Sequence, residues 1–283
     1  MDAVLVELTK DELGIINNAL NEVYHLAAMK KIKCCVHCLV ELTKPPKSGM
    51  LTDTSATLDH VFPKRWFPES TPQNLNRWTV PACHKCNDEL SGVEKVLLNR
   101  MALCLDLTKP ELMALYQKVR KGLALNLSEA ERKQIDPEEL KVREADKKKV
   151  FGDVKPWDEL SPEEKKSLFP GLGPWQTSAP QLSLPIKQED IVREAEKMVR
   201  GCEWKIAKRL VEPPYSVQVH FVHEQDVPDS IWQIVEKSAK TYSIGSYFRV
   251  QRAVAHDDPL VVFYRIEFWG NVRAYAFIID KEH

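Results

Sequence analysis

Residues 35 to 87 hold the side chains of this sequence that are best suited to chemistry. They are Cys35 and Cys38, Asp59 and His60, Asn74, Cys83 and Cys86, and Asn87. Each Cys-x-x-Cys pair places two thiolates on one tight turn, which is the spacing that tetrahedral Zn²⁺ takes. Two pairs complete a site of four sulfurs with no open position, so the sequence predicts a structural zinc ion.

The cysteines have other interpretations that the spacing disfavours. Cys34 adjoins Cys35, but only Cys35 has the Cys-x-x-Cys spacing to Cys38. Reduced, buried thiols without a metal are the plain alternative. A disulfide framework is not expected, because the cysteines are seven in number and no signal peptide precedes them in this chain of 283 residues.

The long segment between the two cysteine pairs carries Asp59 and His60. A histidine can take a proton from water near neutral pH. Carboxylate and amide oxygens are hard ligands that suit Mg²⁺. Neighbouring residues on a strand point to opposite faces, so the pair can serve one site only where the strand is distorted or a helix lies across the site. A structural histidine is the plain alternative for His60, and its place inside the cysteine frame favours chemistry.

Together these motifs resemble the HNH endonuclease family, and in particular its zinc-stapled members in which the last motif residue is Asn. The resemblance rests on both cysteine pairs and on residues 59 to 66, 72 to 75 and 80 to 87, and it covers about residues 30 to 105. It implies a ββα-metal fold with Asp59 and His60 on the first strand and Asn87 on the helix. The apolar residues after Asn87 recur at helical spacing, and Asn87 itself is expected to open that helix.

The resemblance also implies a role for each residue. His60 is the general base that activates the attacking water, and Asp59 and Asn87 hold a catalytic Mg²⁺ or Mn²⁺. Asn74 orients the loop and the histidine, and Asn76 is a second candidate for this role. The implied activity is that of a metal-dependent endonuclease, a phosphodiester hydrolase with products ending in a 5′-phosphate and a 3′-hydroxyl.

The implied partner is nucleic acid, with DNA expected before RNA. The net charge of −1 is not that of a strongly basic binder, so a local patch must attract phosphates. Candidate contacts flank the motifs, although each alone is also an ordinary solvated charge: Lys64, Arg65, Arg77, Lys85 and the knuckle histidines His37 and His84. A non-catalytic zinc-dependent module that binds nucleic acid or another protein is the alternative.

Composition indicates a globular protein. Hydrophobic residues make up 43% of the chain, and no apolar run approaches the ~18 residues that span a membrane. Without signal architecture we expect the cytoplasm, where thiols stay reduced. The resemblance suggests bacterial defence or a mobile element as the setting.

The predicted fold class is α+β, with an HNH nuclease module between flanking helices and a separate C-terminal α+β domain. An N-terminal strand and helix are predicted over residues 1 to 33, where a capping box at residues 9 to 12 begins an amphipathic helix that runs to about Lys30. The module covers residues 34 to 105. A helical segment covers 106 to 152, with one helix starting at Pro110 and a highly charged helix from Ser128 to Lys149 that Pro137 interrupts. A linker rich in Pro and Trp covers 153 to 186.

Residues 187 to 283 form the predicted C-terminal domain. Helices are predicted at 189 to 210 and 230 to 240, and strands at 215 to 222, 247 to 254, 260 to 269 and 272 to 279. A Gly270-Asn271 turn joins the last two strands. No catalytic motif is present here, so recognition, regulation, homodimer formation or binding of a partner protein is the expected role.

Overall fold

The computed structural model describes residues 34–47, 50–103, 105, 107, 109–125, 127–156, 159–162, 182–183, 186–221, 233, 237–256, 258–270 and 272–280. The predicted N-terminal helix, most of the Pro- and Trp-rich linker and most of the predicted helix at 230 to 240 lie outside these residues. Within them, no helix is both long enough and apolar enough to cross a membrane.

The cysteine-rich region folds as a hairpin followed by a helix. Strands β1 (Ala56–His60) and β2 (Thr79–Cys83) pair antiparallel, with Ala56 opposite Cys83 and His60 opposite Thr79. A short 3₁₀ helix, η1 (Lys64–Trp66), lies in the connection between them. Helix α2 (His84–Ala102) follows β2 directly and therefore starts at His84 rather than at Asn87 as predicted. The thiol of Cys83 caps this helix by accepting a hydrogen bond from the backbone of Cys86, which fixes the earlier start.

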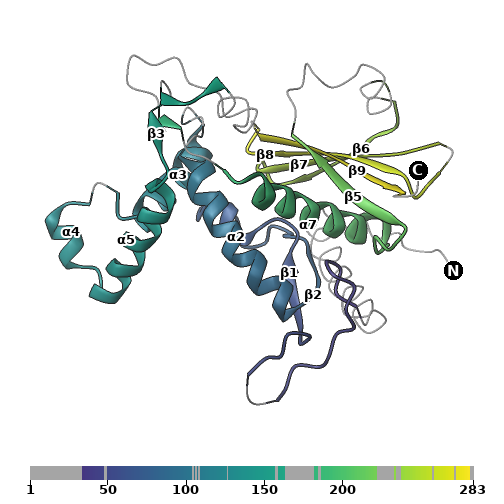
Figure 1. Cartoon of the computed structure of the whole chain (residues 1–283), viewed down its shortest axis with the longest axis horizontal. Coiled ribbons are helices and arrows are strands. Elements are labelled where there is room, and N and C mark those ends of the chain that lie inside the picture. Colours follow the sequence, from purple (N-terminus) through teal and green to yellow (C-terminus); the bar gives the residue numbers. More distant parts are fainter. Residues whose placement is uncertain are drawn as a thin grey trace, which may run out of the picture.

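Three further helices form a lobe beside α2 (Figure 1). The helix predicted to start at Pro110 is α3 (Pro110–Gly122). The charged segment after residue 128 forms two helices, α4 (Glu129–Lys133) and α5 (Pro137–Phe151), on either side of the predicted interruption. A two-stranded sheet of β3 (Lys155–Pro156) and β4 (Leu182–Ser183) follows.

The C-terminal part consists of one long helix and a five-stranded antiparallel sheet. Helix α7 covers Gln188–Ala207, and the sheet has the order β5-β9-β8-β7-β6. The strands are β5 (Tyr215–His220), β6 (Lys240–Ile244), β7 (Phe248–Val254), β8 (Val262–Phe268) and β9 (Val272–Asp280). Four of them match the predicted strands, and β6 is additional. The α+β class is confirmed.

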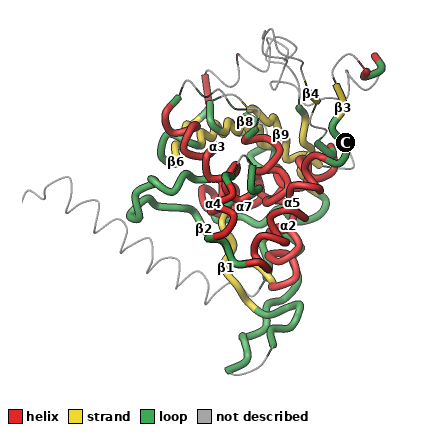
Figure 2. Tube along the Cα trace, turned by 90° about the vertical axis from the view of Figure 1, so that its left-hand side faces the viewer, coloured by secondary structure: helices red, strands yellow, loops and turns green. Residues whose placement is uncertain are grey.

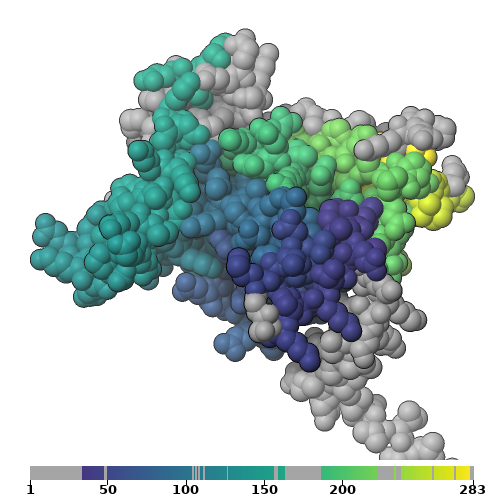
Figure 3. Space-filling view, turned by 60° about the horizontal axis from the view of Figure 1, so that its bottom comes forward, coloured from purple at the N-terminus to yellow at the C-terminus, as the bar shows by residue number. Residues whose placement is uncertain are grey.

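Helix α7 lies between the sheet and the hairpin (Figure 1 and Figure 2). Figure 3 shows the purple segment that begins at residue 34 against the green segment that contains α7. The rings of Phe62 and Phe248 lie 4.7 Å apart, and those of Trp66 and Trp269 lie 5.3 Å apart. The indole of Trp269 also donates a hydrogen bond of 3.2 Å to the carbonyl of Trp66. One buried cluster therefore runs from the hairpin into the C-terminal sheet, so residues on both sides of position 187 share a core.

Candidate functional site

The four predicted zinc ligands meet at the end of the hairpin where Ala56 pairs with Cys83. The sulfurs of Cys35, Cys38, Cys83 and Cys86 all lie within 4.8 Å of one another. The first knuckle is fixed to β2 by a backbone hydrogen bond of 3.0 Å from Val36 to Pro81. The second knuckle joins the end of β2 to the first turn of α2.

The electrostatics of this cluster suit a bound cation. Hydrogen bonding from Cys86 lowers the pKa of Cys35 to about 4, whereas the same contact raises the pKa of Cys86. Burial raises the pKa of Cys38 to about 11. Without a cation, the thiolate of Cys35 is therefore favoured over those of Cys38 and Cys86. Neighbouring thiolates repel one another, and a Zn²⁺ ion bound tetrahedrally by all four sulfurs would offset that repulsion. These residues therefore fit a structural zinc ion.

Asp59 lies on β1 but its carboxylate is buried and already engaged. His37 donates a hydrogen bond of 2.9 Å to one oxygen, and the ammonium of Lys197 lies 3.3 Å from the other. Burial opposes ionisation of Asp59, but the hydrogen bond from His37 and the charge of Lys197 outweigh it and lower the pKa of the carboxyl. His37 was expected at the surface or on a phosphate, and this was wrong: its side chain is 6% exposed and serves Asp59.

Lys197 comes from α7 and has three acidic neighbours. Its ammonium contacts Glu94 of α2, lies 3.6 Å from Glu194 one turn earlier on α7, and reaches Asp59. Burial alone would lower the pKa of Lys197, but the three carboxylates raise it, so the side chain stays charged. Burial raises the pKa of Glu194 to about 8 and also raises that of Glu94. Sequence reasoning missed this set, because only the fold brings α7 against β1 and α2.

His60 ends β1 and is partly buried. Burial lowers its pKa, and the positive charges of Lys197, Lys64 and Arg77 act in the same direction, whereas Asp59 opposes them. Its Nδ1 is buried and has no hydrogen-bond partner among the described residues. The imidazole is therefore neutral near pH 7, which is the form that can accept a proton.

The two predicted amides lie in different surroundings. Asn87, in the first turn of α2, donates to the hydroxyl of Thr57 at 3.2 Å and to the carbonyl of Leu58 at 3.4 Å, so α2 is tied across β1. Asn74 is exposed in the loop before β2, as is Asn76. No described interaction joins Asn74 to His60 or Asp59.

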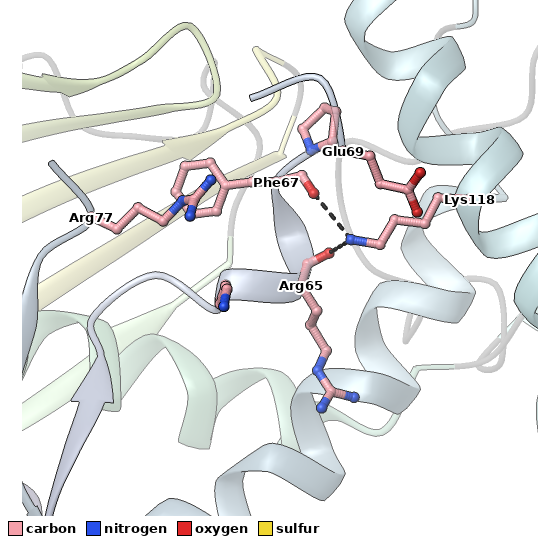
Figure 4. A pocket seen from close by; sticks show the side chains of 7 residues that line it. Arg65, Phe67, Glu69, Arg77 and Lys118 are labelled. Carbon is pink, nitrogen blue, oxygen red and sulfur yellow. Dashed lines mark hydrogen bonds between the residues drawn. The ribbon is translucent and has the colours of Figure 1, made fainter. Parts of the chain in front are cut away.

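A basic pocket of about 360 Å³ lies beside η1 (Figure 4). Four cationic residues and one acid line it together with an aromatic ring and a proline: Lys64, Arg65, Arg77, Lys118, Glu69, Phe67 and Pro68. Arg77 stacks over the ring of Phe67 at 5.3 Å. Lys118 donates to the carbonyls of Arg65 and Phe67 at 3.1 and 3.2 Å, and burial lowers its pKa. Lys118 carried no sequence signal, since its contacts arise only when α3 packs on η1.

A catalytic Mg²⁺ does not fit Asp59 in this arrangement. Both carboxylate oxygens have partners, and the ammonium of Lys197 would repel a divalent cation. Among the described His, Cys, Asp and Glu side chains, the group able to hold a metal is the four cysteines. Comparison with family models, with curated proteins and with solved structures finds no match for this chain.

Proposed function

We propose that this chain is a zinc-stapled endonuclease that hydrolyses phosphodiester bonds of nucleic acid, with DNA as the first substrate to test. One observation carries the proposal. The hairpin β1–β2 leads directly into α2, four sulfurs close its far end, and His60 ends β1 next to basic side chains. This order of elements and residues is the one that the HNH resemblance implies.

In this proposal His60 takes the proton of the attacking water. Its neutral form supports that role. Lys64 and Arg77, whose charges act on His60, would bind the phosphate and stabilise the charge that develops on it. Zinc holds the two ends of the module together and takes no part in bond cleavage. The resemblance adds Mg²⁺ at Asp59 and Asn87, but no step is assigned to that ion because Asp59 does not fit it.

A second function is favoured by the state of Asp59. A carboxylate that is engaged by Lys197 and His37 can have a purely structural role. The basic pocket would then make this chain a zinc-dependent module that binds nucleic acid without cutting it.

Cleavage assays separate the two functions. Zinc-loaded protein is incubated with supercoiled plasmid or single-stranded RNA, each with Mg²⁺, with Mn²⁺ and without added divalent metal. Endonuclease function predicts nicking or linearisation that His60→Ala lowers by about 10²–10⁴-fold. His220→Ala, which changes an exposed histidine on β5, is the matched control and keeps the wild-type rate. Binding without cleavage in every condition, by a folded protein, would instead establish the second function.

A further inference from the structure

Lys197 lies at the centre of three carboxylates from three elements. Asp59 comes from β1, Glu94 from α2 and Glu194 from α7 itself, and the ammonium contacts all of them. The side chains of Lys197 and Glu194 are each 1% exposed, and that of Asp59 is 4% exposed. Three buried carboxylates around one point are the surroundings that a protein offers a hard cation.

We propose that the ammonium of Lys197 is the resident cation of this carboxylate site and excludes a divalent cation from Asp59. The lysine thus takes the place that the HNH resemblance gives to Mg²⁺. This inference concerns occupancy of the site and does not rest on the proposed nuclease activity.

Geometry supports exclusion rather than coexistence. The ammonium lies 3.3 Å from one oxygen of Asp59, and His37 takes the other at 2.9 Å. A metal bound to either oxygen would lie close to a fixed positive charge in a dry environment, where the repulsion is barely screened. The backbone of Lys197 is fixed because α7 packs on the hairpin, where Met198 and Val199 are fully buried. The ammonium is fixed by its ion pairs with the carboxylates.

Glu194 shows what the site would do without the lysine. Both of its oxygens are buried and have no hydrogen-bond partner among the described residues. Arg65 lies 3.9 Å from Glu94 but does not reach Glu194 or Asp59 in the described ion pairs. Loss of the ammonium would leave the carboxyl groups of Asp59, Glu94 and Glu194 without their shared cation, and a divalent ion would then take its place and balance the charge of those that are ionised.

Mn²⁺ binding to the zinc-loaded protein tests the proposal directly. Free Mn²⁺ is followed by electron paramagnetic resonance for the wild type and for Asp59→Asn. The proposal predicts the same number of bound ions and the same affinity in both proteins. A wild-type Mn²⁺ site that Asp59→Asn removes would overturn it.

A second pair of variants decides the matter if Asp59→Asn does not fold. Lys197→Met removes the charge and keeps an apolar stem, and Lys205→Met is the control on the same helix. We expect Mn²⁺ to bind at least about tenfold more tightly to Lys197→Met than to the wild type, because a unit charge beside the ion is gone. The same addition should raise the melting temperature of Lys197→Met but leave the wild type and Lys205→Met unchanged. A Lys197→Met protein that neither binds Mn²⁺ more tightly nor is stabilised by it would refute the proposal.

Discussion

Helix α7 contributes to two ion clusters of opposite charge pattern: one carboxylate among cations, and one ammonium among carboxylates. At one, the carboxylate of Glu203 is fully buried and is shared by Arg252, by Arg209 at 3.0 Å and by the hydroxyl of Tyr264. Arg252 donates two hydrogen bonds of 3.0 and 2.9 Å to it. At the other, the ammonium of Lys197 is shared by three carboxylates, and Glu194 obtains no described hydrogen bond.

The difference separates a cluster that holds the fold from one that borders the candidate site. Around Glu203, Arg252 and Tyr264 donate directed hydrogen bonds to the carboxylate, and Arg209 adds an ion pair in which its Nε makes no described hydrogen bond. Around Lys197 the acids outnumber the cation, and burial, with a smaller contribution from the neighbouring acids, raises the pKa of Glu194 and Glu94. Groups with perturbed pKa values cluster at functional sites, which fits the influence of Lys197 on His60.

The largest effect is expected when α7 and both clusters are removed together. Deletion of residues 187 to 283 would expose the core faces of Phe62 and Trp66 and leave Asp59 and Glu94 without Lys197. We therefore expect the remaining chain to lack a cooperative unfolding transition, which circular dichroism and zinc content can measure. A soluble, zinc-loaded fragment with a sharp transition would instead support the separate C-terminal domain that the sequence predicts.

Removal of Glu203 alone should have the next largest effect. Glu203→Ala leaves the partly buried guanidinium of Arg252 and the buried hydroxyl of Tyr264 without their shared acceptor. Breaking a buried ion pair in this way typically lowers the free energy of unfolding by about 3–5 kcal/mol. Urea denaturation should report this loss, whereas Glu212→Ala, which changes an exposed acid just after α7, should stay close to wild type. An equal, small effect of both variants would contradict the structural role of the Glu203 cluster.

The same helix shows what the sequence could reveal. Apolar spacing predicted a helix at residues 189 to 210, and the apolar residues Ile191, Ala195 and Met198 lie on the buried face of α7. The convergence of the four cysteines was also predictable, because each pair is local in sequence and its spacing is typical of a metal site. The buried position of Lys197 was not predictable, because helical periodicity assigns a charged residue to the exposed face. Its partner Glu94 is also 103 residues away in the sequence.

The strands of the sheet illustrate a second limit. The sequence pattern predicted four strands, among them β8 and β9, whose residues pair in register from Val262 opposite Ile278 to Phe268 opposite Val272. Strand β6 was not predicted, because it is an edge strand with mostly exposed, polar residues. Such a strand is defined by its pairing with β7 rather than by its own pattern.

A pH-dependent effect should distinguish Glu194 from Glu203. Burial raises the pKa of Glu194 from 4.5 to about 8 in the folded chain. Between these values the folded state keeps a proton that the unfolded state has released, so stability falls as pH rises through this window. The side chain of Glu194→Gln does not titrate, so this variant lacks that loss of stability.

We therefore expect Glu194→Gln to match the wild type near pH 5 and to exceed it by on the order of 2 kcal/mol near pH 7. Urea denaturation at several pH values gives both numbers. Glu203→Gln is the matched change in the other cluster and should be destabilising at each pH, because an amide cannot accept every bond that the carboxylate accepts. Parallel pH profiles for wild type and Glu194→Gln would show that Glu194 is ionised in the folded chain.

The smallest effect concerns Gly201, which lies on α7 between Lys197 and Glu203. A Cβ added there would come within 2.8 Å of Val61, whose side chain is fully buried next to His60 and cannot move away. Gly92, on α2, has no atom within 4 Å of the corresponding position. Overpacking typically costs about 1–3 kcal/mol, whereas replacement of a helical Gly by Ala contributes about 0.5–1 kcal/mol. We expect Gly201→Ala to lose roughly 1 kcal/mol net and Gly92→Ala to gain slightly less than that, both measured by urea denaturation with zinc content unchanged. If Gly201→Ala were as stable as Gly92→Ala, the close approach of α7 to the end of β1, and with it the fixed position of Lys197 beside Asp59, would be refuted.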